Sequence, residues 1–273
     1  MNGTGHSLAS PKSKIERASR HIDDLVTADK TFFDTRPYTS FKETNAEGTE
    51  DTYKLRFDKP APLELSVIIG DAVHNLRSAL DQVACCLAVK NGHTDTTGTY
   101  FPFGRSKQAF ERADTQRKIN KLSPDAANLV RGFEPYRGGN SLLWALHELD
   151  IIDKHRSIVA VRATRVGGIV GQFRATGLRE GLNFVGLPEW DPLDEEIAYL
   201  RLPAGAQIEG DLNTVVAIVF DKPDPVRGKQ VIATLRQLAR VTQGIVDLIE
   251  TRFYADEVGT MPGKQRLTVT TWG

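Results

Sequence analysis

The sequence has no excess of charge of either sign, no long apolar run and few cysteines. Lys and Arg together number 35, as do Asp and Glu, so no net field draws the whole chain to nucleic acid or to an anionic membrane. No window approaches the roughly 18 consecutive apolar residues of a membrane span, and the N-terminus lacks the apolar segment of a signal peptide. We therefore expect no membrane partner.

The two cysteines, Cys85 and Cys86, are adjacent within a helical pattern. Neighbours on a helix point about 100° apart, so we predict free thiols, which are typical of a cytoplasmic protein. The chain also lacks zinc-type Cys/His spacing, a Gly-x-Ser-x-Gly nucleophile motif and a Gly-x-x-x-x-Gly-Lys phosphate loop. No cofactor signature is present, and we predict no cofactor.

Side chains of the kinds that ligate metals occur in two of the helical patterns, at His74, Asp81, Asp150, Asp153 and His155. They form no His-x-x-x-His or Glu-x-x-His pair on one helix face. The Arg and Lys residues interleaved with them oppose the binding of a cation. We therefore expect no metal site.

Apolar periodicity predicts four long helices and two short ones. Their apolar residues recur every three or four positions, and Pro, Gly or Asn stands near most of their ends. The predicted helices span residues 12–31, 63–90, 107–114, 124–131, 141–155 and 229–254. Period-two alternation predicts strands at residues 38–44, 51–57, 157–166, 169–176, 196–202 and 213–220, with hairpin turns at Asn45–Gly48 and Gly167–Gly168.

These elements predict an α+β fold, a bundle of three or four long helices with antiparallel β-hairpins packed as a layer or an insertion. Residues 11–254 form one domain, in which residues 156–220 are the β-rich part. Residues 1–10 are expected to be disordered, and residues 255–273 to form a flexible tail.

Three helices carry apolar faces that predict the core. The face of the helix at residues 63–90 has heptad spacing and calls for a helical partner. A homodimer through residues 63–90 or 229–254 is therefore possible. The predicted core faces are Ile15, Ile22, Leu25, Val26 and Phe32; Ile69, Val73, Leu76, Leu80, Val83 and Leu87; and Val231, Leu235, Leu238, Ile245, Leu248 and Ile249.

Polar residues line one flank of the helix at residues 63–90. On a helical wheel Gly70, His74, Arg77, Asp81 and Ala88 fall on one side. Small residues allow a second helix to approach, so the three polar side chains are expected at a helix–helix boundary. The simplest interpretation is structural, an Arg77–Asp81 ion pair with His74 hydrogen-bonded beside it.

The helix at residues 141–155 has an acid where its apolar stripe should continue. Leu142, Leu146 and Leu149 lead to Asp153, and a carboxylate on a core stripe needs a cationic partner. Arg77 and His74 are the natural candidates; the alternative is that Asp153 lies in a last turn open to water. Lys154, His155 and Arg156 suit a helix C-terminus, whereas His147 and Glu148 lie off the stripe and are expected to face solvent.

The segments His74-Asn-Leu-Arg-Ser-Ala-Leu-Asp81 and Asp153-Lys-His-Arg156, with Phe101-Pro-Phe103 and Phe133-Glu-Pro-Tyr136 between them, resemble a family of uncharacterised bacterial proteins. The resemblance covers residues 61–166. The first segment is also similar to the Arg-x-x-x-x-His motif of HEPN-type helical ribonucleases, which implies an Arg and a His at an RNA phosphate across a dimer cleft. Counting from Arg77, this chain has Gln82 where that motif has His, so only His74 is left for the imidazole role.

Three functions are open to the chain. The first is a non-catalytic or accessory protein whose His/Arg/Asp network fixes the register of two helices. The second is a HEPN-like RNA-cleaving toxin or defence enzyme. The candidate catalytic residues are His74, Arg77, Asp81, Asp153 and His155, and the candidate binding residues are Asn75, Lys154 and Arg156. The third is a small-ligand-binding protein with a pocket at Tyr100, Phe101 and Trp144.

Overall fold

A computed structural model describes residues 8–155, 161–170, 173–177, 196–210 and 213–255. The chain mixes helices with small antiparallel sheets, as predicted. The helices are α1 (Ala9–Asp34), α2 (Leu63–Lys90), α3 (Lys107–Phe110), α4 (Ala113–Gln116), η1 (Arg117–Ile119), α5 (Pro124–Gly132), α6 (Ser141–His155) and α7 (Val231–Phe253). The strands are β1 (Tyr38–Thr44), β2 (Glu50–Phe57), β3 (Val161–Val170), β4 (Phe173–Thr176), β5 (Glu196–Pro203), β6 (Gln207–Gly210) and β7 (Asn213–Phe220).

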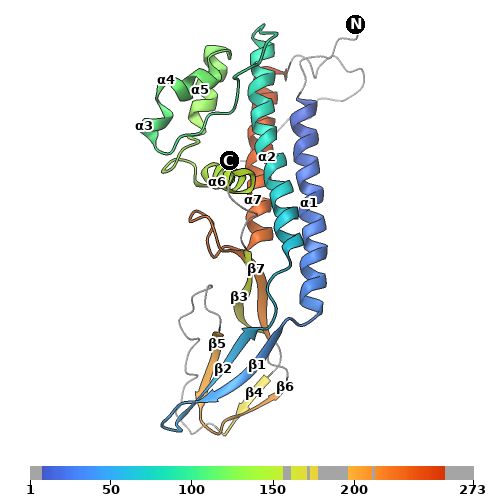
Figure 1. Cartoon of the computed structure of the whole chain (residues 1–273), viewed down its shortest axis with the longest axis vertical. Coiled ribbons are helices and arrows are strands. Elements are labelled where there is room, and N and C mark those ends of the chain that lie inside the picture. The colour runs from blue at the N-terminus through green and yellow to red at the C-terminus, as the bar shows by residue number, and fades with distance from the viewer. Residues whose placement is uncertain (1–7, 156–160, 171–172, 178–195, 211–212, 256–273) are drawn as a thin grey trace, which may run out of the picture.

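Helices α1, α2 and α7 lie side by side, and α6 crosses α2 and α7 on the side away from α1 (Figure 1). The strands extend beyond the end of these helices where α1 stops and α2 starts (Figure 1). The main core fills the space between the long helices, and the predicted heptad face of α2 is buried there, at Ile69, Val73, Leu76, Leu80, Val83 and Leu87. That face is thus occupied within one chain, and a homodimer through residues 63–90 or 229–254 stays a prediction.

Local signals set the helix ends. Asn91 follows the last turn of α2 and Gly92 takes a positive φ of 85°, a conformation that favours glycine and stops a helix. The Asn140 side chain accepts hydrogen bonds from the amides of Leu142 and Leu143, so it caps α6. Ser123 caps α5 through the amide of Ala126.

The predicted β1–β2 hairpin is confirmed, and β5 adds to it as a third antiparallel strand. Asp51, on β2, is buried and ties the sheet together. Its carboxylate accepts hydrogen bonds from Thr44 and Lys42 of β1 and from the amide of Gly205, just after β5. Donation by Thr44 and Lys42 lowers the pKa of Asp51 and keeps the buried group ionised.

The predicted hairpin at Gly167–Gly168 is wrong. Strand β3 continues through both glycines and pairs with β7, and the register of this ladder shifts between Arg165 and Ile169. Paired glycines inside a strand mark an irregular ladder as readily as a turn. The residues after β3 pair elsewhere, with β4 against β6. Residues 157–160, predicted as the start of this strand, lie outside the described residues.

The helices need smaller corrections. Helix α1 is longer at both ends than the predicted range of residues 12–31, and Val26 is only half-buried. The helix predicted at residues 107–114 is two short ones, α3 and α4. On α7, Leu248 is 45% exposed and Val246 takes its place in the core. Residues 1–7 and 256–273, expected as a disordered start and a flexible tail, lie outside the described residues.

Candidate functional site

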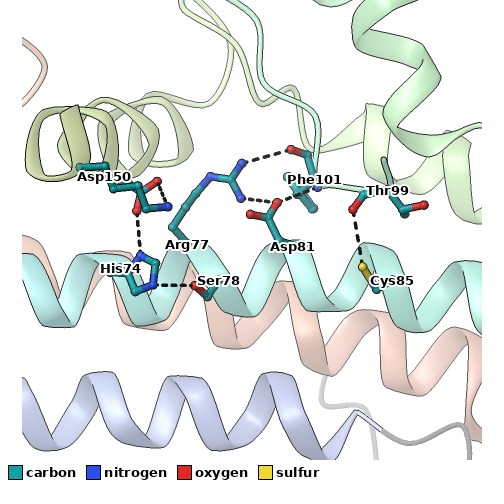
Figure 2. Close-up of polar contacts among 9 residues, drawn as sticks. His74, Arg77, Ser78, Asp81, Cys85, Thr99, Phe101 and Asp150 are labelled. Carbon is teal, nitrogen blue, oxygen red and sulfur yellow. Dashed lines mark hydrogen bonds and ion pairs between the residues drawn. The ribbon is translucent and has the colours of Figure 1, made fainter. Parts of the chain in front are cut away.

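The polar row of α2 consists of His74, Arg77 and Asp81. It faces the chain segment at residues 99–103 and helix α6, which both pack on the same side of α2 (Figure 2). His74 points toward α6, and Arg77 and Asp81 point toward Phe101. The small residues of this flank, Gly70 and Ala88, are buried. The predicted helix–helix boundary is therefore found at His74, which faces α6, whereas Arg77 and Asp81 face a loop segment and not a second helix.

Arg77 is the centre of the row and is only 8% exposed. Its Nη1 lies 2.5 Å from Asp81 Oδ1, and its Nη2 donates to the Phe101 carbonyl at 3.4 Å. The same Asp81 oxygen accepts the Phe101 amide at 2.9 Å. The guanidinium carbon is 4.4 Å from the centre of the Phe103 ring, within cation–π range. The predicted Arg77–Asp81 pair is thus confirmed, and it fixes the Phe101–Phe103 segment on α2.

The contact between Arg77 and Asp81 is a charge contact rather than an aligned hydrogen bond, because Nη1 donates no hydrogen bond at this geometry. The Arg77 Nε also has no acceptor among the described residues. A buried guanidinium with unused donors depends all the more on its one carboxylate. Loss of either partner would therefore leave an uncompensated charge.

The predicted pairing of Arg77 with Asp153 is wrong. No ion pair joins them within the described ranges, and the Asp153 carboxylate instead packs on Gly70, where an added Cβ would overlap it. Arg77 lies seven residues further along α2, about 10 Å at the helical rise. Asp153 is half-buried, and burial, followed by the charges of Asp150 and Asp71, raises its pKa.

Asp150 is the acid that joins the two helices. It is buried, its Oδ1 lies 3.4 Å from His74 Nδ1, and its Oδ2 accepts a 2.9 Å hydrogen bond from Lys154. The sequence indicates Asp150 only as a possible metal ligand and not as this contact. The Asp150–Lys154 spacing of four residues, which favours ion pairs on a helix, is the signal that could have indicated it.

Ser78, His74 and Asp150 lie in the order of a nucleophile, a base and an orienting acid (Figure 2). Both contacts of His74 are 3.4 Å long, beyond the roughly 2.6–3.2 Å of an activated nucleophile. Ser78 lies in the middle of α2, where its amide serves the helix and is not free to stabilise an oxyanion. We interpret Ser78, His74 and Asp150 as a chain of hydrogen bonds that holds α6 against α2.

His147 was expected to face solvent, and this is wrong. Its ring stacks on Phe103 with the centroids 4.4 Å apart, and the Trp144 ring lies 5.5 Å away. Burial, followed by the positive charge of Arg77, lowers the pKa of His147 to about 3, so the ring is neutral. Its Nδ1 is buried and has no hydrogen-bond partner among the described residues. Helical periodicity gave no sign of this site, because Phe103 reaches α6 from a distant loop.

The other predicted site residues are not brought into one cleft. Asn75 donates to the backbone of its own helix at Asp71. Phe101 is fully buried and Tyr100 is 51% exposed, so they do not share a pocket with Trp144. The His155 side chain and the whole of Arg156 lie outside the described residues.

The two turn motifs of the resemblance pack against each other. The Gly104 amide donates to the Pro135 carbonyl, and the Gly104 carbonyl accepts from the Arg137 amide. The Phe101 and Phe133 rings stack with their centroids 6.4 Å apart. An added Cβ at Gly104 would meet the backbone of Phe110 at 2.7 Å, so only glycine fits there. The pairing holds the segment that carries Phe103 over α2 and α6.

Three observations bear on what the chain binds or belongs to. In the part of the chain that the structure describes, no three His, Cys, Asp or Glu side chains gather as metal ligands. In the same part, every helix is too short or too polar to cross a membrane. The chain matches no protein-family model, no curated protein and no solved structure.

The Gly70–Asp153 contact predicts a sign change between two backgrounds. Gly70→Ala is expected to destabilise the protein by about 1 kcal/mol, because the methyl group must displace a half-buried carboxylate. In an Asp153→Ala background the same change should stabilise it by up to about 1 kcal/mol, the helix-propensity gain of Ala over Gly. Urea unfolding of the four proteins measures both values, and equal effects in the two backgrounds would contradict the contact.

Proposed function

We propose that this protein is a non-catalytic, accessory α+β protein, and that its polar row is a structural device. In this proposal residues 11–254 are one domain, α1, α2 and α7 form its helical bundle, and the strands are an insertion at one end. The Arg77–Asp81 pair holds the Phe101–Phe103 segment, and the His74–Asp150–Lys154 chain holds α6.

The burial of Arg77 is the observation that carries this proposal. A cation that stabilises charge in a reaction must reach the substrate. Arg77 is instead 8% exposed and is occupied by Asp81, the Phe101 carbonyl and the Phe103 ring. Its surroundings are those of a structural ion pair.

The HEPN-like alternative draws on a different observation. The His74 side chain is 45% exposed, so an imidazole is accessible at this end of the row. RNA cleavage by this chain would then depend on His74 with Lys154 as the nearby cation, and Arg77 would only position the helix. RNA remains the partner under this alternative.

An RNA cleavage assay separates the two functions. We expect end-labelled single-stranded and hairpin RNAs to remain intact with the wild-type protein, in the presence of EDTA to silence metal-dependent contaminants. His74→Ala serves as the active-site variant and His93→Ala, on an exposed loop, as its matched control. Cleavage that is abolished by His74→Ala and retained by His93→Ala would overturn the non-catalytic proposal.

A further inference from the structure

A cavity of about 530 Å³ lies on the side of α6 away from Asp150. One wall is a single face of α6, formed by Trp144, Glu148 and Ile152 at spacings of four residues. The other lining residues are Arg137 and the segment Lys222–Pro225, which follows β7. The volume is within the range of small-molecule sites.

The floor of this cavity is apolar. Trp144 is 7% exposed and packs beside His147, and Ile152, Pro223 and Pro225 complete the apolar surface. Only a small part of the Trp144 indole is open to the cavity, and the half-buried Ile152 and Pro225 supply further apolar contact. The floor therefore suits an apolar body of the size of an aromatic ring.

The charged side chains around the floor balance in sign and lack partners. Arg137 and Lys222 are cationic, and Glu148 and Asp224 are anionic. Within the described residues none of the four side chains forms a hydrogen bond or an ion pair. By contrast, three charged side chains of the cavity beside Arg56 are engaged with one another, since Arg56 contacts both Asp58 and Glu196.

We propose that this cavity binds a small zwitterion with an apolar body, a molecule of the amino-acid class. An anion without an amine would face Glu148 and Asp224, and a cation without an acid would face Arg137 and Lys222. A ligand that carries both groups meets an opposite charge at each, with its apolar body on Trp144. The site goes beyond the proposed structural role of the polar row, because it uses none of the residues of that row.

Three probes with the same phenyl body test the proposal by calorimetry with the full chain. L-phenylalanine carries both charges, phenethylamine only the amine, and 3-phenylpropionate only the acid. We expect L-phenylalanine to bind about tenfold more tightly than either of the others, as two charge-assisted contacts allow. Equal affinities for the three probes, or no saturable binding of L-phenylalanine at about 10 mM, would overturn the proposal.

Two variants assign the charges. The double variant Glu148→Gln/Asp224→Asn should abolish the preference for L-phenylalanine over 3-phenylpropionate and keep its preference over phenethylamine. The double variant Arg137→Gln/Lys222→Gln should do the reverse. Lys107→Gln, at the edge of a different cavity, should leave all three affinities unchanged. Because the substituted side chains of the cavity have no hydrogen bond or ion pair within the described residues, circular dichroism should be unaltered. An unchanged preference in folded Glu148→Gln/Asp224→Asn would refute the site.

Discussion

Arg77→Ala is expected to lower the free energy of unfolding by about 3 kcal/mol or more, the usual result of breaking a buried ion pair. The substitution strands the Asp81 carboxylate, which is 73% shielded from solvent by the fold (side-chain exposure 27%). It also removes the donor to the Phe101 carbonyl and the cation on the Phe103 ring. We expect the segment at residues 99–103 to loosen first, because both hydrogen bonds of Phe101 to α2 pass through this pair. Their loss leaves only the 3.5 Å contact from the Cys85 thiol to the Thr99 carbonyl among the described residues.

Urea unfolding of the variant, with hydrogen exchange at the Phe101 amide, measures both effects. The matched control is Arg20→Ala, which removes the same kind of pair with Glu16, four residues away on the exposed face of α1. Exposed pairs of this kind contribute well under 1 kcal/mol, so the control should unfold almost as the wild type does. A loss no larger in Arg77→Ala than in Arg20→Ala would contradict the structural role.

Acid is expected to destabilise the protein through His147. In the unfolded chain this imidazole takes up a proton near pH 6.5, but burial beside Arg77 lowers its folded pKa to about 3. Its contribution to stability is therefore complete above pH 6.5 and is lost progressively as the pH falls toward 3. The loss is at most about 1.4 kcal/mol per pH unit over that window, and it adds to whatever the carboxylates contribute.

The difference in the free energy of unfolding between wild type and His147→Phe, measured as a function of pH, isolates the contribution of His147. Phenylalanine keeps an aromatic ring against Phe103 and Trp144 but does not titrate, so the variant should lose less stability than the wild type between pH 7 and pH 4. His93→Phe, at an exposed position, should follow the wild-type profile. Parallel profiles for wild type and His147→Phe would show that the ring is not buried as a neutral group.

Elements set by local pattern were predictable, and those set by distant pairing were not. Helix α2 and strand β1 have the predicted bounds. The apolar stripe and the Asn-Gly stop of α2, and the period-two alternation of β1, each depend only on residues that are neighbours in the sequence. The Gly167–Gly168 pair was misassigned because a turn and an irregular strand give the same local signal. The addition of β5 to the first hairpin depends on residues far away in the sequence, and no local pattern encodes it.

In the candidate site, too, contacts within one helix were predictable and contacts between distant segments were not. The Arg77–Asp81 pair follows from a four-residue spacing on one helix and was predicted. The partner of Asp153 depends on where along α2 the helix α6 crosses. A helical wheel gives the direction of a side chain around the helix axis but not its position along that axis. His147 was missed because the ring that covers it, Phe103, arrives on a loop whose path is fixed by the Gly104–Pro135 contact.

The pairing of β2 with β5 has a consequence for biosynthesis. Glu50 pairs with Pro203, so the β1–β2 hairpin emerges from the ribosome long before the strand that completes its sheet. Until then the open side of β2 offers unpaired amides and carbonyls, which makes the nascent chain a template for aggregation. Closing so long a loop also slows folding. Truncations that end before residue 196 should therefore require a chaperone to stay in solution, whereas the full chain should not.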